Sequence, residues 1–185
     1  MQRINQLIGH YRTFISLILG LVILALAKPS VRSIEWGLPF ILIGELVRTW
    51  SAGCINKEYE QLTTWGPYAY TRNPLYVGNF LLGLGFVMMG NQWILIALFV
   101  FLFLFVYRST ILDEENTLYK VFGETFIQYK TAVPRFIPLL TPSKNTHYTF
   151  TWKRVFKHRE FNAWIGILTG ILIMALKYKY GWNLN

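Results

Sequence analysis

The most constraining feature of this sequence is a 35-residue stretch, Asn73–Tyr107, that contains no Asp, Glu, Lys, Arg or His. A helix needs about 20 apolar residues to cross the hydrocarbon core of a bilayer. The stretch is too long for one such helix, and Gly90-Asn91 near its middle is a typical turn signal. It therefore predicts a tight hairpin of two membrane helices, roughly 75–90 and 92–109.

Three further apolar segments lie outside this stretch, at about 13–28, 36–53 and 161–177. Only 15% of the residues are charged, against about 25% in ordinary soluble domains. No A-x-A-like cleavage site follows the first segment, so we interpret it as a retained helix and not as a signal peptide. The sequence thus predicts an all-α integral membrane protein with about five transmembrane helices, forming a single domain over residues 1–185.

The distribution of Lys and Arg predicts the orientation of these helices. With the N-terminus in the cytoplasm, 13 of the 18 basic residues lie on the cytoplasmic side and 4 on the other, as the positive-inside rule requires. The polar segments 54–74 and 108–160 then share the cytoplasmic face. The basic and aromatic segment 141–160 is typical of chain lying on a membrane surface. In this setting the net charge of +9 indicates contact with anionic lipids and not with nucleic acid.

The first polar segment contains GPYAYTRNPLYVGN, Gly66–Asn79. Its prolines fix a turn and then the first turn of a helix. Tyr68, Tyr70, Arg72 and Asn73 therefore stand at a helix N-terminus, whose free N–H groups suit an anion. An interfacial aromatic belt with a positive-inside arginine is the alternative interpretation.

The second polar segment, Asp113–Pro138, begins with three successive acids and continues at helical spacing to about residue 132, interrupted by Gly123. A solvated helix start that matches the helix dipole is the alternative interpretation of the acids. Glu45 and Arg48 lie one turn apart inside the second apolar segment, where ions usually pair or line a site. We interpret Phe99, Phe101, Phe103 and Phe105 as lipid-facing bulk.

Metal and disulfide chemistry have little support in the sequence. Cys54 is the single cysteine, so no disulfide can form within the chain, and a thiolate metal cluster is disfavoured. The three histidines, His10, His147 and His158, lie outside both Gly66–Asn79 and Asp113–Pro138 and form no cluster. We therefore expect no metal site and no histidine triad.

Taken together, the motifs GELVRTWSAG (44–53), GPYAYTRNPLYVGN (66–79) and EEN…FG…Y…VPRFIP (114–138) resemble the isoprenylcysteine carboxyl methyltransferase family. This family belongs to a wider set of membrane phospholipid and isoprenylcysteine methyltransferases. The resemblance covers about Gly44–Pro138, half of the chain, and leaves 141–185 without a role. It implies methyl transfer from S-adenosylmethionine to a lipophilic substrate, such as an isoprenylcysteine carboxylate, at the cytoplasmic membrane interface. The five-span layout looks like the compact prokaryotic members, which implies the prokaryotic inner (plasma) membrane.

The resemblance also implies roles for particular residues. Catalytic roles fall to Arg72 and Glu115, and substrate contacts to Glu45 and Arg48. The residues implied in cofactor binding are Tyr68, Tyr70, Asn73, Pro74, Leu75, Tyr76, Gly78, Asn79, Glu114, Tyr129, Pro134 and Arg135.

One departure from the family pattern bears on mechanism. Many members have Arg-His-Pro where this chain has Arg72-Asn73-Pro74, and asparagine cannot titrate, so proton transfer at residue 73 is excluded. The alternatives are a phospholipid or amine N-methyltransferase, an NADPH-dependent reductase of related fold, and a non-catalytic membrane protein. The missing glycine-rich phosphate loop argues against a nucleotide diphosphate.

Overall fold

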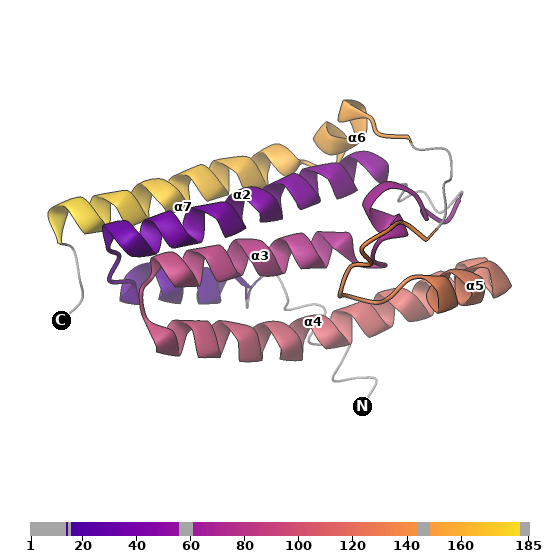
Figure 1. Cartoon of the computed structure of the whole chain (residues 1–185), viewed down its shortest axis with the longest axis horizontal. Helices are drawn as coiled ribbons and strands as arrows, with labels where there is room; N and C mark the ends of the chain where they lie inside the picture. Colours follow the sequence, from indigo (N-terminus) through magenta and orange to yellow (C-terminus); the bar gives the residue numbers. More distant parts are fainter. Residues whose placement is uncertain (1–13, 15, 56–60, 144–148, 182–185) are drawn as a thin grey trace.

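The computed structural model describes residues 14, 16–55, 61–143 and 149–181. All regular elements within these ranges are helical, and they contain no strand. In chain order the helices are Ser16–Leu26, α2 (Val31–Cys54), η1 (Gly66–Ala69), α3 (Pro74–Met89), α4 (Trp93–Phe122), α5 (Glu124–Ala132), α6 (Trp152–Lys157) and α7 (Glu160–Tyr180). The long helices run side by side along the longest dimension, and η1, α5 and α6 lie at one end (Figure 1).

The closest helix pair is α2 and α3, which make the most extensive contact in the described structure. Glycines on both helices permit this approach. A Cβ atom on Gly44 would lie 2.8 Å from the carbonyl oxygen of Gly78, and one on Gly85 would lie 2.8 Å from that of Gly37. Small residues let membrane helices meet backbone to backbone. The glycine-rich helix α3 therefore lies inside the bundle, as its sequence predicts.

The predicted hairpin is confirmed, since α3 ends at Met89 and α4 begins at Trp93. The prediction that α4 ends near residue 109, with a separate helix after it, is wrong. The helix continues without interruption to Phe122, because no glycine or proline occurs before Gly123. Gly123 has a φ of 51°, a conformation that glycine adopts at little cost, and it separates α4 from α5.

Two of the described helices, α4 and α7, are long and apolar enough to cross a membrane by length and composition. Ser16–Leu26 and α3 are apolar but shorter. Helix α2 has 24 residues and carries Glu45 and Arg48, and it does not meet the same criterion. The five-span layout and its orientation stay predictions, and the first predicted span begins at residue 13, outside the described residues.

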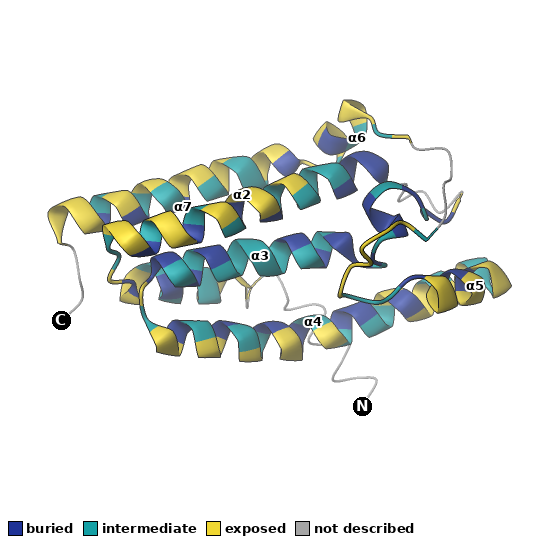
Figure 2. Ribbon diagram, in the orientation of Figure 1, coloured by how far each residue is buried: buried dark blue, intermediate teal, exposed yellow. Residues whose placement is uncertain are grey.

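Each long helix has buried and exposed positions (Figure 2), and large apolar side chains occupy positions of both kinds. The core of the bundle contains Ile41, Val87, Leu95 and Met174, whereas the outer surface carries large apolar side chains on α4 and α7. A helix that is apolar on all sides is typical of a membrane span.

The four phenylalanines at residues 99–105 divide between the two environments. Phe99 and Phe103 are buried, and Phe101 and Phe105 are exposed. The prediction that all four face lipid is wrong for two of them. With 3.6 residues per turn, helix residues two apart lie on nearly opposite sides, whereas residues four apart share a side.

The two polar segments meet at one end of the bundle. The amide of Arg72 donates to the carbonyl of Pro134 at 2.9 Å, that of Leu139 donates to Tyr70 at 2.9 Å, and that of Thr151 donates to Gly53 at 3.0 Å. The first two bonds join 54–74 to 108–160, as the sequence predicts, and the third joins 108–160 to the end of α2.

Candidate functional site

A polar cavity of about 800 Å³ lies where the two polar segments meet. Residues of α2, α3, α4, α5 and α7 line it together with the 61–72 segment. The lining residues are Arg48, Ile55, Gln61, Leu62, Thr63, Tyr68, Arg72, Leu75, Tyr76, Asn79, Tyr107, Thr110, Asp113, Glu114, Thr117, Leu118, Phe122, Tyr129 and Glu160.

The first wall of the cavity is built by the segment around η1. Tyr68 is buried, and within the described part of the chain its hydroxyl has no hydrogen-bond partner. Its main-chain oxygen accepts a hydrogen bond from the hydroxyl of Tyr129 at 2.7 Å, which ties α5 to η1. Burial raises the pKa of both tyrosines. Both hydroxyls are therefore protonated at neutral pH, and that of Tyr68 is available to a ligand.

The second wall is one face of α4. Tyr107, Thr110, Glu114 and Thr117 follow one another at intervals of three or four residues, which places them on the same side of a helix. The hydroxyl of Tyr76 donates to Glu114 Oε1 at 2.6 Å and so links α3 to α4. The sequence analysis missed Tyr107, Thr110 and Thr117, although their spacing from Glu114 is the signal that identifies this face.

Glu115 lies behind this wall, between two arginines. Its Oε1 is 3.0 Å from an Nη of Arg72, and its Oε2 is 2.9 Å from Nη2 of Arg135, whose Nε also donates to Oε1 at 3.0 Å. Burial lowers the pKa of Arg72, and the charge of Glu115 opposes this shift. The hydrogen bond to Glu115 raises the pKa of Arg135. Arginine remains charged at any physiological pH, so the three groups form a charged brace with a net positive charge.

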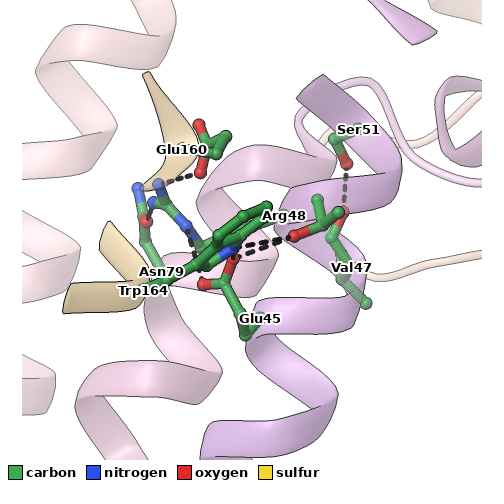
Figure 3. Close-up of polar contacts among 8 residues, drawn as sticks. Glu45, Val47, Arg48, Ser51, Asn79, Glu160 and Trp164 are labelled. Carbon is green, nitrogen blue, oxygen red and sulfur yellow. Dashed lines mark hydrogen bonds and ion pairs between the residues drawn. The ribbon is translucent and has the colours of Figure 1, made fainter. Parts of the chain in front are cut away.

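A second cluster of charges joins α2, α3 and α7 (Figure 3). Arg48 Nη2 donates to Glu160 Oε2 at 2.7 Å, Nη1 donates to Asn79 Oδ1, and Nε lies 3.5 Å from Glu45 Oε2. Glu45 Oε1 in turn accepts from the indole N–H of Trp164 at 2.7 Å. The predicted pairing of Glu45 with Arg48 is present, and α7 supplies two further partners that the sequence did not indicate.

The structure brings half of the predicted site residues to the cavity. Those that line it are Arg48, Tyr68, Arg72, Leu75, Tyr76, Asn79, Glu114 and Tyr129. The others are outside its lining: Glu45, Tyr70, Asn73, Pro74, Gly78, Glu115, Pro134 and Arg135. Asn73 donates from Nδ2 to the carbonyl of Arg135 at 3.0 Å, and Gly78 packs against Gly44. Which of these residues contact a cofactor stays a prediction.

An apolar pocket of about 310 Å³ adjoins the polar cavity, and Asn79 and Tyr107 line both. Its walls come from Ser16–Leu26, α3, α4 and α7. Gly20 and Gly166 are part of its lining, and a Cβ atom on either would meet nothing within 4 Å. The pocket therefore has room for an apolar chain directly beside the polar cavity.

Among the described residues no group of three His, Cys, Asp or Glu side chains is placed to hold a metal ion. Cys54, the single cysteine of the sequence, is buried. His10 and His147 lie outside the described residues.

The apolar helices are those of a membrane protein, and in the described bundle a polar cavity adjoins an apolar pocket. The family model for phospholipid methyltransferases matches residues 15–125. This range is more than half of the chain, and the chain belongs to this family. Helix α7, including Glu160, lies beyond the matched residues.

Several curated proteins are similar to the chain. A protein-S-isoprenylcysteine O-methyltransferase of Schizosaccharomyces pombe is 38% identical over 85 residues, 46% of this chain and 36% of the relative. The Rattus norvegicus protein of the same name is 32% identical over 130 residues, 60% of this chain and 45% of the relative. The nickel-cobalt-cadmium resistance protein NccN of Alcaligenes xylosoxydans xylosoxydans is 29% identical over 140 residues, 72% of this chain and 65% of the relative.

The aligned part of the chain thus spans between about a third and two thirds of the length of these relatives. No solved structure matches the chain significantly.

Proposed function

We propose that this chain transfers a methyl group from S-adenosylmethionine to a lipophilic acceptor at the cytoplasmic membrane interface. The observation that carries the proposal is the adjacency of the polar cavity and the apolar pocket, which share Asn79 and Tyr107. Methyl transfer requires the methyl group of a polar donor to lie in line with the acceptor atom, so donor and acceptor must bind next to each other. Here the acceptor would enter from the bilayer. The family and the names of the isoprenylcysteine O-methyltransferase relatives support the same chemistry.

The residues present fit this cofactor. S-adenosylmethionine carries a sulfonium and an ammonium against one carboxylate, so it is a net cation. Among the charged side chains that line the polar cavity, Glu160 is paired with Arg48, and the remaining acids, Asp113 and Glu114, outnumber Arg72. The hydroxyl of Tyr68 and Nε of Arg72 are buried without hydrogen-bond partners, and such groups are costly unless a ligand satisfies them.

Each side chain can then be given a role. Asp113 and Glu114 would accept hydrogen bonds from the ribose hydroxyls or the ammonium group. Tyr68 and Arg72 would donate to the carboxylate. We assign Glu115 to holding Arg72 in place, because both of its oxygens are bound by arginines behind the cavity wall.

The cofactor supplies a methyl group activated by the positive charge on sulfur. Transfer forms a bond from the acceptor atom to the methyl carbon and breaks the S–C bond, whose electron pair stays on sulfur. Such a displacement needs alignment and exclusion of water more than acid–base catalysis. A carboxylate acceptor is already ionised at neutral pH and needs no base, which suits a cavity whose described lining contains no histidine.

The direct test is to incubate purified protein with a membrane extract of the source organism and S-adenosylmethionine labelled in the methyl group. We expect label in the lipid-extractable fraction, and excess adenosylhomocysteine should abolish it. Label released by alkali as methanol would identify a carboxyl methyl ester, and alkali-stable label would indicate methylation of nitrogen or sulfur. A folded protein that labels nothing, or that binds NADPH in competition with adenosylmethionine, would contradict the proposal.

A further inference from the structure

Arg48 has more anchoring partners than a single ion pair would supply. Arg48 is held on three sides by groups from three helices: Glu45 on its own helix, Asn79 on α3 and Glu160 on α7 (Figure 3). Arginine side chains have substantial conformational freedom when they are not anchored. These anchors therefore fix the guanidinium in one position.

That position is the junction of the two cavities. Arg48, Asn79 and Glu160 line the polar cavity, and Asn79 also lines the apolar pocket. Gly166 and Gly170, one and a half to three turns along α7 from Glu160, line the apolar pocket as well. Helix α7 thus forms part of the wall on both sides of the junction.

We infer that Arg48 contacts the polar head of the methyl acceptor and that Glu160 is a positioning residue that holds Arg48 at the junction. The inference rests on the proposed function and deepens it. A guanidinium has five N–H donors, and the contacts to Glu160 and Asn79 use one on each Nη atom. The remaining Nη donors are available to an acceptor head that carries a hydrogen-bond-accepting oxygen. Its apolar chain would lie in the pocket beyond Asn79.

Trp164 supports the same arrangement from the next turn of α7. Its indole N–H donates to Glu45 Oε1 at 2.7 Å, and Glu45 lies beside Arg48. Glu45 is outside the cavity lining. We therefore assign it to fixing the α2–α7 contact, in place of the predicted contact with substrate.

A double-mutant cycle tests the role of Glu160. The wild type, Glu160→Gln, Arg48→Gln and the double variant are compared in the labelling reaction, with membrane extract titrated as the source of acceptor. We expect Glu160→Gln to raise the half-saturating amount of extract about tenfold. The double variant should be no worse than Arg48→Gln alone, because Glu160 acts through Arg48. The Kd for adenosylhomocysteine should stay within about twofold in all variants.

Glu124→Gln is the matched control, since Glu124 is also the first residue of a helix but is exposed. It should leave both measurements unchanged. If Glu160→Gln lowers the maximal rate and the unfolding temperature without changing the dependence on extract, Glu160 is only structural and the inference is wrong. Multiplicative effects in the double variant would also contradict it. Failure of the wild type to bind adenosylhomocysteine would instead contradict the proposed function.

Discussion

Glu115 shows how the environment of a residue decides what it can do. The sequence places it among three successive acids, and the family resemblance suggests a catalytic role. In the structure it is buried between Arg72 and Arg135, and neither of its oxygens is available to the cavity. Its neighbour Glu114 lines the cavity and also binds Tyr76. Two adjacent acids thus have different surroundings, which residue type and order do not reveal.

The brace around Glu115 gives a prediction for stability. Glu115→Gln removes the charge that two arginines share, and breaking a buried ion pair costs about 3 kcal/mol or more. We expect a clear fall in the unfolding temperature in detergent. Glu124→Gln, at an exposed position, should change it little. Equal unfolding temperatures for the two variants would show that the brace does not stabilise the fold.

The two buried tyrosines predict a loss of stability at high pH. Burial raises the pKa of Tyr68 and Tyr129 above the ordinary value, so the folded protein holds their protons more tightly than the unfolded chain does. Their contribution is complete below about pH 10, where unfolded tyrosine titrates, and is lost as the pH rises further. Unfolding temperatures measured from pH 8 to 11 should therefore fall at the alkaline end. The fall should be smaller for Tyr129→Phe, and an unchanged slope would contradict this account.

At the scale of elements, sequence patterns predicted the helices well where glycine or proline marks an end. The α3–α4 turn and the break at Gly123 follow from such residues. The patterns failed where charge was taken as a boundary, since α4 passes through Arg108 and the acids without a break. Charged side chains mark where a helix reaches water, whereas the backbone preferences of glycine and proline determine where the helix ends.

The packing of α2 on α3 gives a prediction at this scale. A Cβ atom on Gly78 would lie 2.7 Å from the carbonyl oxygen of Gly44, so Gly78→Ala forces two backbones apart. We expect a cost of about 2 kcal/mol in the free energy of unfolding. Gly166→Ala is the matched control, because its Cβ meets nothing within 4 Å. That change should be neutral or should stabilise the helix by up to about 1 kcal/mol. Equal effects of the two substitutions would contradict the close packing.

At the scale of the molecule, the meeting of segments 54–74 and 108–160 at one end could be predicted from charge distribution. The position of α7 could not. No motif connects Glu160 to Arg48 or Trp164 to Glu45, and both contacts, each across more than 100 positions, are a product of helix packing. The apolar pocket could not be predicted from the sequence either. It exists because four helices pack in a way that leaves empty space beside Gly20 and Gly166.

The apolar pocket gives a prediction about where the chain of the proposed acceptor binds. Gly166 lines the apolar pocket, and a Cβ atom there meets nothing within 4 Å, so Gly166→Leu would begin a side chain in open space. We expect labelling of the lipid fraction to fall at least about tenfold while adenosylhomocysteine binding is kept. Leu168→Phe adds bulk to an exposed position of the same helix and should leave labelling unchanged. Full labelling by Gly166→Leu would show that the acceptor chain lies elsewhere.

The central claim is that the polar cavity holds S-adenosylmethionine, and its most direct test is calorimetric titration of the detergent-solubilised protein with adenosylhomocysteine. We predict saturable binding at one site per chain, weakened at least about tenfold by Glu114→Ala and unchanged by Glu124→Ala. A wild-type protein with a cooperative unfolding transition but no heat of binding would contradict the claim.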